Sequence, residues 1–108
     1  PERGIVDLYK GQSSLGFFYL GNSLYKLGYF EECIKAFIKC GELQGYDAQL
    51  NYNLGIAYFK LEEYSMAIDY LKQCTVQDPL HKYAFNNLAY IYNIHQYYQE
   101  TINICMQA

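Results

Sequence analysis

The chain has 108 residues, of which 52% are hydrophobic, so it has the size of one domain and enough apolar material for a core. Its formal net charge of -3 gives no reason to expect a nucleic-acid partner, because nucleic-acid sites are basic stripes. No apolar run approaches the roughly 18 to 20 residues of a membrane-spanning helix and no signal-peptide pattern opens the chain, so no membrane partner is expected.

The chain repeats itself at a regular interval of about 34 residues, a length typical of stacked helical pairs. The repeat aligns Leu20-Gly21 with Leu54-Gly55 and with Leu88-Ala89. A helical pair cannot bury its apolar face alone, so such a period predicts units that stack on one another. We therefore expect one all-α array of helix pairs, without strands or low-complexity linkers.

The first element is a short segment, residues 1–13. Val6 and Tyr9 lie in the register where the second helix of a preceding unit would bury side chains. The segment is therefore either the tail of such a helix or an ordered arm. Because the chain begins at Pro1 and stops inside an apolar periodic segment, we expect it to be part of a larger protein.

The first full unit covers residues 14–47. Leu20, Leu24 and Leu27 form a second apolar face on its first helix, which should therefore pack on more than one side. Gly28 then supplies the residue without a Cβ that helix ends prefer. A tight turn there leads into the second helix of the unit.

The second unit, residues 48–81, is the cleanest copy of the repeat. Asp78-Pro79 ends its second helix, because proline cannot continue a helix and disfavours helical geometry in the residue before it. The third unit, residues 82–108, should turn at His95-Gln96-Tyr97 and is cut short. The whole chain is thus expected to hold six helices.

No side chain is placed for catalysis. Glu31 and Glu32 open a helix, so we interpret them as solvated charges that stabilise the helix dipole. His81 and His95 have no cysteine or carboxylate at catalytic spacing and are expected to be exposed. The sequence therefore predicts neither an enzyme nor a bound cofactor.

The four cysteines indicate a reducing compartment. They are scattered through helical segments without a Cys-x-x-Cys pair or a histidine cluster, which disfavours a metal site and a disulfide framework. Cys33, Cys40, Cys74 and Cys105 are expected to be reduced thiols packed as small hydrophobic groups. An intracellular, cytoplasmic protein is the expectation.

The second unit also carries the residues that suggest a family. The matching residues, in chain order, are Leu54-Gly55, Tyr58, Tyr64, Ala67 and Pro79. At this spacing the chain closely resembles three tandem tetratricopeptide repeats from residue 14 onward. The resemblance implies an α-α superhelix, a right-handed solenoid of antiparallel helix pairs, in which small residues such as Gly21 and Gly55 let paired helices cross closely.

One departure from the family pattern concerns packing. Where the family often has tryptophan, this chain has Phe17, Asn51 and Phe85. Asn51 therefore puts a polar group where an aromatic ring usually packs.

In the family, the first helix of each unit lines a concave groove. Carried over residue by residue, this implies a groove formed by Phe18, Asn22, Tyr25, Lys26, Gln49, Tyr52, Asn53, Ile56, Phe59, Lys60, Tyr83, Asn86, Asn87, Tyr90 and Ile94.

These side chains suit a peptide or protein ligand. Aromatic rings offer a large contact area at a small entropic cost, and the amides of Asn22, Asn53 and Asn87 can both donate to and accept from a peptide backbone. Lys26 and Lys60 could bind one acidic side chain.

One subfamily binds the acidic C-terminal tails of heat-shock chaperones through a clamp of basic residues and asparagines. Asn22 and Asn53 match the clamp asparagines, but Phe18, Tyr83 and Asn87 stand at its basic positions. A terminal carboxylate would lose charged partners worth roughly 1.5 to 3 kcal/mol each. We therefore predict that this chain does not bind such tails.

Two other functions remain open at this stage. The chain could be a structural segment of a longer solenoid that forms homo-oligomers through its exposed ends. It could also recruit substrates to an enzyme outside this sequence.

Overall fold

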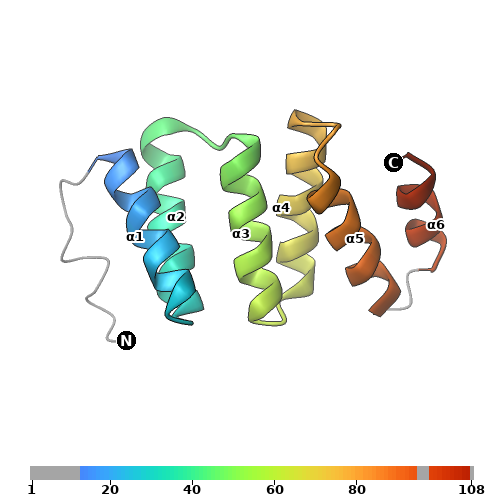
Figure 1. Ribbon diagram of the computed structural model, residues 1–108, viewed down its shortest axis with the longest axis horizontal. Helices are drawn as coiled ribbons and strands as arrows, with labels where there is room; N and C mark the ends of the chain where they lie inside the picture. The colour runs from blue at the N-terminus through green and yellow to red at the C-terminus, as the bar shows by residue number, and fades with distance from the viewer. Residues whose placement is uncertain (1–12, 95–97, 108) are drawn as a thin grey trace.

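The computed structural model describes residues 13–94 and 98–107 of the chain. In that part the chain is all-helical and contains no strand (Figure 1). The helices are α1 (Ser14–Lys26), α2 (Phe30–Gln44), α3 (Ala48–Lys60), α4 (Tyr64–Gln77), α5 (Lys82–Ile94) and α6 (Tyr98–Gln107). The expected arm at residues 1–13, apart from Ser13, and the expected turn at His95-Gln96-Tyr97 lie outside the described residues.

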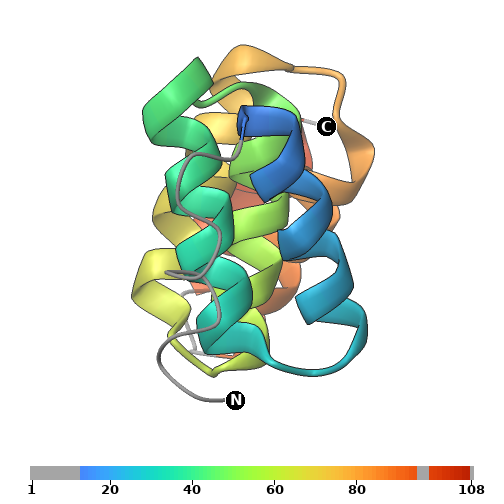
Figure 2. The same cartoon turned by 90° about the vertical axis from the view of Figure 1, so that its left-hand side faces the viewer.

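The helices form antiparallel pairs that follow one another in a row. Equivalent helices start at evenly spaced positions, Ser14 for α1, Ala48 for α3 and Lys82 for α5, so the structure keeps the period of the sequence. Viewed along the row, α1 lies on one side while α2 and α4 lie on the other (Figure 2). Within the described residues, no helix is long and apolar enough to cross a membrane.

Each of the first two pairs is joined by a three-residue turn of the same geometry. Gly28 has a φ of 85°, and Glu62, its equivalent in the second unit, has a φ of 61°. The next residue closes the turn in both pairs. The N–H of Tyr29 donates to the backbone carbonyl of Leu24 (2.9 Å), and the N–H of Glu63 donates to the backbone carbonyl of Tyr58 (3.0 Å). Glycine adopts this left-handed conformation freely, whereas glutamate adopts it at a cost.

Two glycines allow the paired helices to cross closely, as the sequence predicts. A Cβ on Gly21 would lie 2.5 Å from the ring of Phe37, and one on Gly55 would lie 2.7 Å from Cγ of Leu71. Neither separation is possible between real carbon atoms. The apolar side chains of α2 and α4 therefore occupy the space that a larger residue on α1 or α3 would take.

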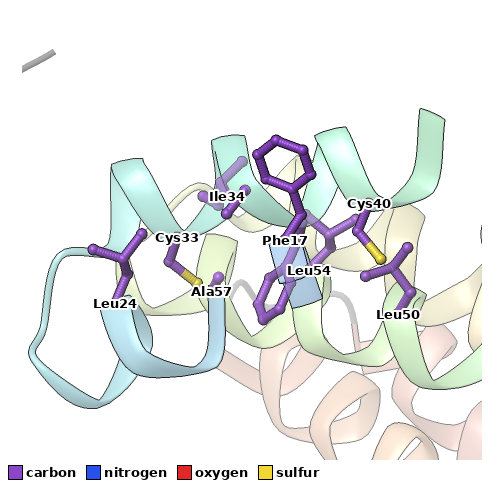
Figure 3. Packing of buried hydrophobic residues seen from close by; sticks show 10 residues of the cluster. Phe17, Leu24, Cys33, Ile34, Cys40, Leu50, Leu54 and Ala57 are labelled. Atoms are coloured by element: carbon purple, nitrogen blue, oxygen red, sulfur yellow. The ribbon is translucent and has the colours of Figure 1, made fainter. Parts of the chain in front are cut away.

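The core consists of two buried clusters, each of which joins one pair to the next, and Figure 3 shows the first of them. One cluster joins α1 and α2 to α3 through Phe17, Leu24, Cys33, Ile34, Ala36, Phe37, Cys40, Leu50, Leu54 and Ala57. A second joins α4 to α5 and α6 through Ala67, Leu71, Cys74, Ala84, Phe85, Leu88, Ile91, Tyr92 and Ile104. Because apolar burial is the main stabilising term, the pairs hold one another in place.

The buried face of α1 differs from the expected one. Phe17, Gly21 and Leu24 are buried, whereas Leu27 is 67% exposed and Leu20 is only half-buried. Leu27 lies at the helix end, where the chain already turns away from the core. The prediction of a second apolar face formed by Leu20, Leu24 and Leu27 is therefore wrong for Leu27.

Glu32 is also placed differently from the prediction. Its side chain is buried at 4% exposure, and one carboxylate oxygen lies 3.3 Å from Nζ of Lys35. The other oxygen, Oε1, has no hydrogen-bond partner. The interpretation of Glu32 as a solvated charge was wrong, because its side chain is buried on the packed side of α2, although the residue does lie in the first turn of that helix as expected.

Asn51 is buried, as expected for its position, and its polar group is satisfied by a specific partner. The Nδ2 of Asn51 donates to Oε1 of Gln77 (2.7 Å), at the end of α4. The Nε2 of Gln77 in turn donates to the carbonyl of Tyr46 (2.6 Å). Gln77 therefore connects α3 to the linker that precedes it, and we call these two hydrogen bonds the Gln77 clasp.

Equivalent residues cap the first helix of each pair, α1, α3 and α5, with three different side chains. The Oγ of Ser13 accepts from the N–H of Gly16 (3.1 Å), and Oδ1 of Asp47 accepts from that of Leu50 (2.9 Å). At the third position, Nδ1 of His81 accepts from the N–H of Ala84 (3.1 Å). These are N-caps, which satisfy donors that the helix itself leaves free.

His81 is therefore not the exposed histidine that the sequence suggested. Its ring lies half-buried against Tyr52, with ring centroids 4.7 Å apart. His95 lies outside the described residues.

All four cysteines are free thiols. Cys33, Cys40 and Cys74 are buried, as predicted, whereas Cys105 is exposed. Burial raises the pKa of Cys33 to about 12, and burial followed by the nearby Asp78 raises that of Cys74 to about 11. These two thiols are thus protonated and unreactive near neutral pH.

Candidate groove between the first helices

A pocket lies between α1 and α3. It has a volume of about 200 Å³ and is lined by Asn22, Tyr25, Phe37, Tyr52, Asn53 and Ile56. Five of these six residues were predicted from the sequence to line the groove. The structure therefore brings Asn22, Tyr25, Tyr52, Asn53 and Ile56 together in one place.

The two asparagines of the pocket differ in their hydrogen bonds. The Oδ1 of Asn53 accepts from Nε2 of Gln49 (2.8 Å), so one side of this amide is already engaged. No hydrogen bond of the Asn22 side chain is found among the described residues, although the residue is half-buried. The Asn22 amide is thus available to an incoming polar group.

Tyr52 forms the wall of the pocket that faces the third pair. Its ring packs on His81, and its hydroxyl accepts a hydrogen bond from Nδ2 of Asn87 (3.3 Å). Burial raises the pKa of Tyr52, while the bond from Asn87 acts in the opposite direction. The hydroxyl therefore remains protonated near neutral pH, and its ring is fixed from two sides.

Tyr25 and Phe37 complete the apolar lining. Tyr25 packs edge to face on Phe30, with ring centroids 5.3 Å apart, and burial is the main cause that raises its pKa. Phe37 is 1% exposed and belongs to α2. Because it lies opposite Gly21, it forms the floor of the pocket.

Ten predicted groove residues do not line this pocket: Phe18, Lys26, Gln49, Phe59, Lys60, Tyr83, Asn86, Asn87, Tyr90 and Ile94. Phe18 packs on Phe37 at 5.9 Å between centroids, and Phe59 packs on Tyr90 at the same distance. Asn87 also donates to the carbonyl of Tyr83 (2.7 Å). The Nδ2 of Asn87 is therefore already engaged by two neighbours, and a ligand contact of this residue stays a prediction.

Sequence reasoning missed three residues near the groove. Phe37 lies in α2, outside the first helices from which the groove was predicted, and the glycine opposite it could have indicated its place in the lining. Leu15 and Tyr19 are 56% and 60% exposed. They precede Asn22 by seven and three residues, so they share its helix face and extend the apolar surface of the groove beyond the pocket.

The charges around the pocket are unevenly distributed. The sequences of α1, α3 and α5 contain no Asp or Glu. Every described acidic residue lies in α2, α4, α6 or a connecting turn. Lys26 and Lys60, which end α1 and α3, are exposed. In the described residues, no group of three or more histidine, cysteine or acidic side chains could hold a metal ion.

Comparison with known sequences gives consistent matches. Profiles described as Tetratricopeptide repeat match residues 17–46 and 48–79. Intraflagellar transport protein 70A of Danio rerio is 39% identical over 54 residues, which is 50% of this chain and 8% of that protein. Intraflagellar transport protein 70B of Mus musculus is 33% identical over 63 residues, or 58% of this chain and 9% of that protein. The chain thus spans less than a tenth of these relatives.

Solved structures share the fold. The second TPR of Spaghetti (RPAP3), bound to the HSP90 peptide SRMEEVD, superposes with a TM-score of 0.79 at 22% identity, covering 89% of each chain. The first TPR of the same protein, bound to the same peptide, has a TM-score of 0.79 at 20% identity, covering 91% of this chain and 78% of that one. At such identities the likeness concerns the backbone arrangement only.

Proposed function

Because this chain belongs to the tetratricopeptide repeat family and folds as its right-handed α-α superhelix, we propose that it is a protein-interaction module whose groove binds a peptide segment of another protein. The observation that supports this most is the pocket between α1 and α3. It combines aromatic walls with an amide, Asn22, that has no partner in the described residues.

The size and lining of the pocket favour a peptide side chain over a small molecule. Small-molecule sites usually have about 300–1,000 Å³, whereas this pocket has about 200 Å³. The amide of Asn22 can pair with a backbone N–H or C=O beside that side chain, as hydrogen bonding to a peptide requires. A cofactor-dependent or catalytic role has no comparable support here.

The test uses displayed random peptides selected against the folded protein. Peptides enriched in the selection would be labelled with fluorescein and their affinity measured by anisotropy. Asn22→Ala should weaken binding about fivefold to tenfold, since a net hydrogen bond contributes about 1 kcal/mol. Its melting temperature should hardly change, because the amide supports no neighbour.

Gln73→Ala is the matched control, since it removes an exposed amide from α4, outside the groove. It should leave peptide affinity unchanged. Equal affinities for the Asn22→Ala and Gln73→Ala proteins, or no enrichment in the selection, would contradict the proposal.

We do not extend the chaperone ligand of the RPAP3 structures to this chain. Phe18, Tyr83 and Asn87 stand where the chaperone-tail clamp is basic, and Asn87 is bonded to Tyr52 and to the carbonyl of Tyr83. We expect no binding of the peptide SRMEEVD in a calorimetric titration. A low-micromolar affinity would show that the clamp tolerates these substitutions.

A second function is favoured by the outer face of α6. Ile34 is 7% exposed in α2 and Ile68 is half-buried in α4, but their equivalent Ile102 in α6 is 52% exposed. The first two positions pack in the clusters that reach the following pair. The exposed α6 face could therefore stack on another helical pair, in a longer solenoid or a homo-oligomer. Light scattering across concentrations distinguishes a strict monomer from self-association.

Two observations support a proposal for the cellular setting. The buried free thiols favour a reducing, intracellular compartment. The sequence relatives named intraflagellar transport protein 70 favour a transport assembly of the cilium within that compartment, rather than the general cytoplasm. Imaging a tagged full-length protein in ciliated cells tests this placement.

A further inference from the structure

The helices on the groove side of the molecule carry positive charge only, although the chain as a whole is acidic. The net charge is -3, yet α1, α3 and α5 contain no acidic residue. A ligand that lies along these helices therefore meets no carboxylate from them. Like charges disfavour one another and opposite charges attract, so this face selects against basic partners and for acidic ones.

Two lysines concentrate that charge beside the pocket. Lys26 follows Asn22 by four residues and Lys60 follows Ile56 by four, so each lies one helical turn beyond a residue that lines the pocket. The two lysines occupy the same position in successive units of the repeat. They therefore flank the same end of the groove.

The charge of these lysines is not neutralised within the described part of the chain. The one ion pair found there joins Lys35 to Glu32. Glu62 and Glu63 follow Lys60 closely in sequence but form no ion pair with it. Both lysines are exposed and can move toward a ligand.

Stabilisation of the helix dipole alone does not explain this placement. A basic residue in the last helical turn is favourable at any helix. However, α2, α4, α5 and α6 have none there, and only α1 and α3, the helices that border the pocket, end in lysine. The pattern follows the groove rather than the helix ends in general.

These lysines also differ from the chaperone-tail clamp. The clamp positions in this chain are Phe18, Tyr83 and Asn87, which carry no charge. Lys26 and Lys60 lie at the C-terminal ends of their helices, whereas Phe18 and Tyr83 lie in the N-terminal halves of α1 and α5. A ligand would therefore place its acid at the other end of the groove.

We propose that the ligand is a peptide segment with an internal acidic residue about two or three positions from an apolar side chain, the acid lying between Lys26 and Lys60 and the apolar group in the pocket. This inference rests on the proposed peptide-binding function. Four helical residues rise about 6 Å, which an extended peptide spans with about two residues. The free amide of Asn22 then faces the peptide backbone between the two anchors.

The experiment reads the sequences of the peptides selected on the folded protein. An aspartate or glutamate should be enriched two or three positions from an aromatic or aliphatic residue. Replacing that acid by its amide in a fluorescein-labelled peptide should weaken binding about threefold to tenfold at low salt. The difference should shrink as NaCl is raised, because salt screens exposed charges.

Protein variants test the position of the acid. Lys26→Gln and Lys60→Gln should each abolish most of the preference for the acidic peptide over its amide form. Lys39→Gln, which removes an exposed lysine from α2, should leave it unchanged. Two results would overturn this inference while the peptide-binding function stands. The first is a set of selected peptides that bind the Asn22→Ala protein more weakly but show no enrichment of acidic residues. The second is a preference for the acidic peptide that survives both lysine substitutions. A failure of Asn22→Ala to weaken binding would instead count against the peptide-binding function.

Discussion

The first and second helical pairs begin their helices at equivalent positions and share the same turn, yet different side chains stabilise equivalent places in them. Phe17 packs in the core of the first pair, where the second pair buries Asn51. Leu43 is 59% exposed near the end of α2, whereas its equivalent Gln77 forms the clasp at the end of α4. The comparison teaches that the period determines where helices begin, while each unit satisfies its own polar groups locally.

The largest effect should come from removing the clasp. Gln77→Ala leaves the buried amide of Asn51 without its partner and frees the carbonyl of Tyr46. An unsatisfied buried donor costs about 1–3 kcal/mol, so the free energy of unfolding should fall by that amount in urea denaturation. Leu43→Ala, at the equivalent exposed position, should cost less than about 0.5 kcal/mol. Similar losses from both would mean that the clasp does not distinguish the second pair.

An intermediate effect is expected in the two turns. Glu62→Gly should stabilise the protein by up to about 1 kcal/mol, because glycine adopts the positive φ without strain. Gly28→Ala should destabilise it by about 1 kcal/mol, although a Cβ there would meet nothing within 4 Å. Thermal denaturation measures both changes. Opposite signs at these equivalent positions are the expected result, and equal signs would contradict the turn geometry.

The smallest effect concerns the buried thiols at equivalent positions of the two pairs, Cys40 and Cys74. Burial raises the pKa of both, to about 11 for Cys74. Below the usual thiol pKa near 9 both states keep the proton, so pH has no effect on stability through these groups. As pH rises from 9 towards 11, the Cys74 thiol ionises in the unfolded chain but largely keeps its proton in the folded one, so the free energy of unfolding should fall. Cys40, whose pKa is also raised, acts in the same direction.

Labelling of single-cysteine variants at pH 8 separates the two pairs. Each buried thiol should react only after local opening. Gln77→Ala should speed labelling of Cys74, which lies in the same helix, more than that of Cys40. Equal acceleration at both sites would show that the clasp acts on the whole array instead.

The sequence was sufficient for the features that depend on spacing. The helix pairs follow from the period of the sequence, and the close helix crossings at Gly21 and Gly55 follow from the small size of glycine. The structure confirms the pairs and the crossings. Features that depend on a distant partner could not be inferred in this way. Asn51 was recognisable as a polar residue in an aromatic position, but Gln77, 26 residues later, has no signal of its own in the sequence.

The same distinction applies to the groove. Asn22 and Asn53 look alike in the sequence, yet one amide is free and the other is bonded to Gln49. Asn87 shares their helix face but is bonded to Tyr52. Hydrogen-bond competition among neighbouring side chains decides which amide a ligand can use, and helix periodicity does not contain that information. The assignment of these residues to ligand binding stays a prediction.

The clasp also makes one part of the connection before the second pair independent of the side chain there. Gln77 needs only two groups: an amide at position 51, which belongs to the same pair, and a backbone carbonyl at position 46, which any residue supplies. The residue at position 46 can therefore be varied in a designed array without loss of the clasp. Residues 48–81 still need the sequence before them, because the side chain of Asp47 caps α3 and Leu50 and Leu54 pack in one cluster with α2. A protein engineer would have to move the second pair together with Asp47 and an apolar α2 face.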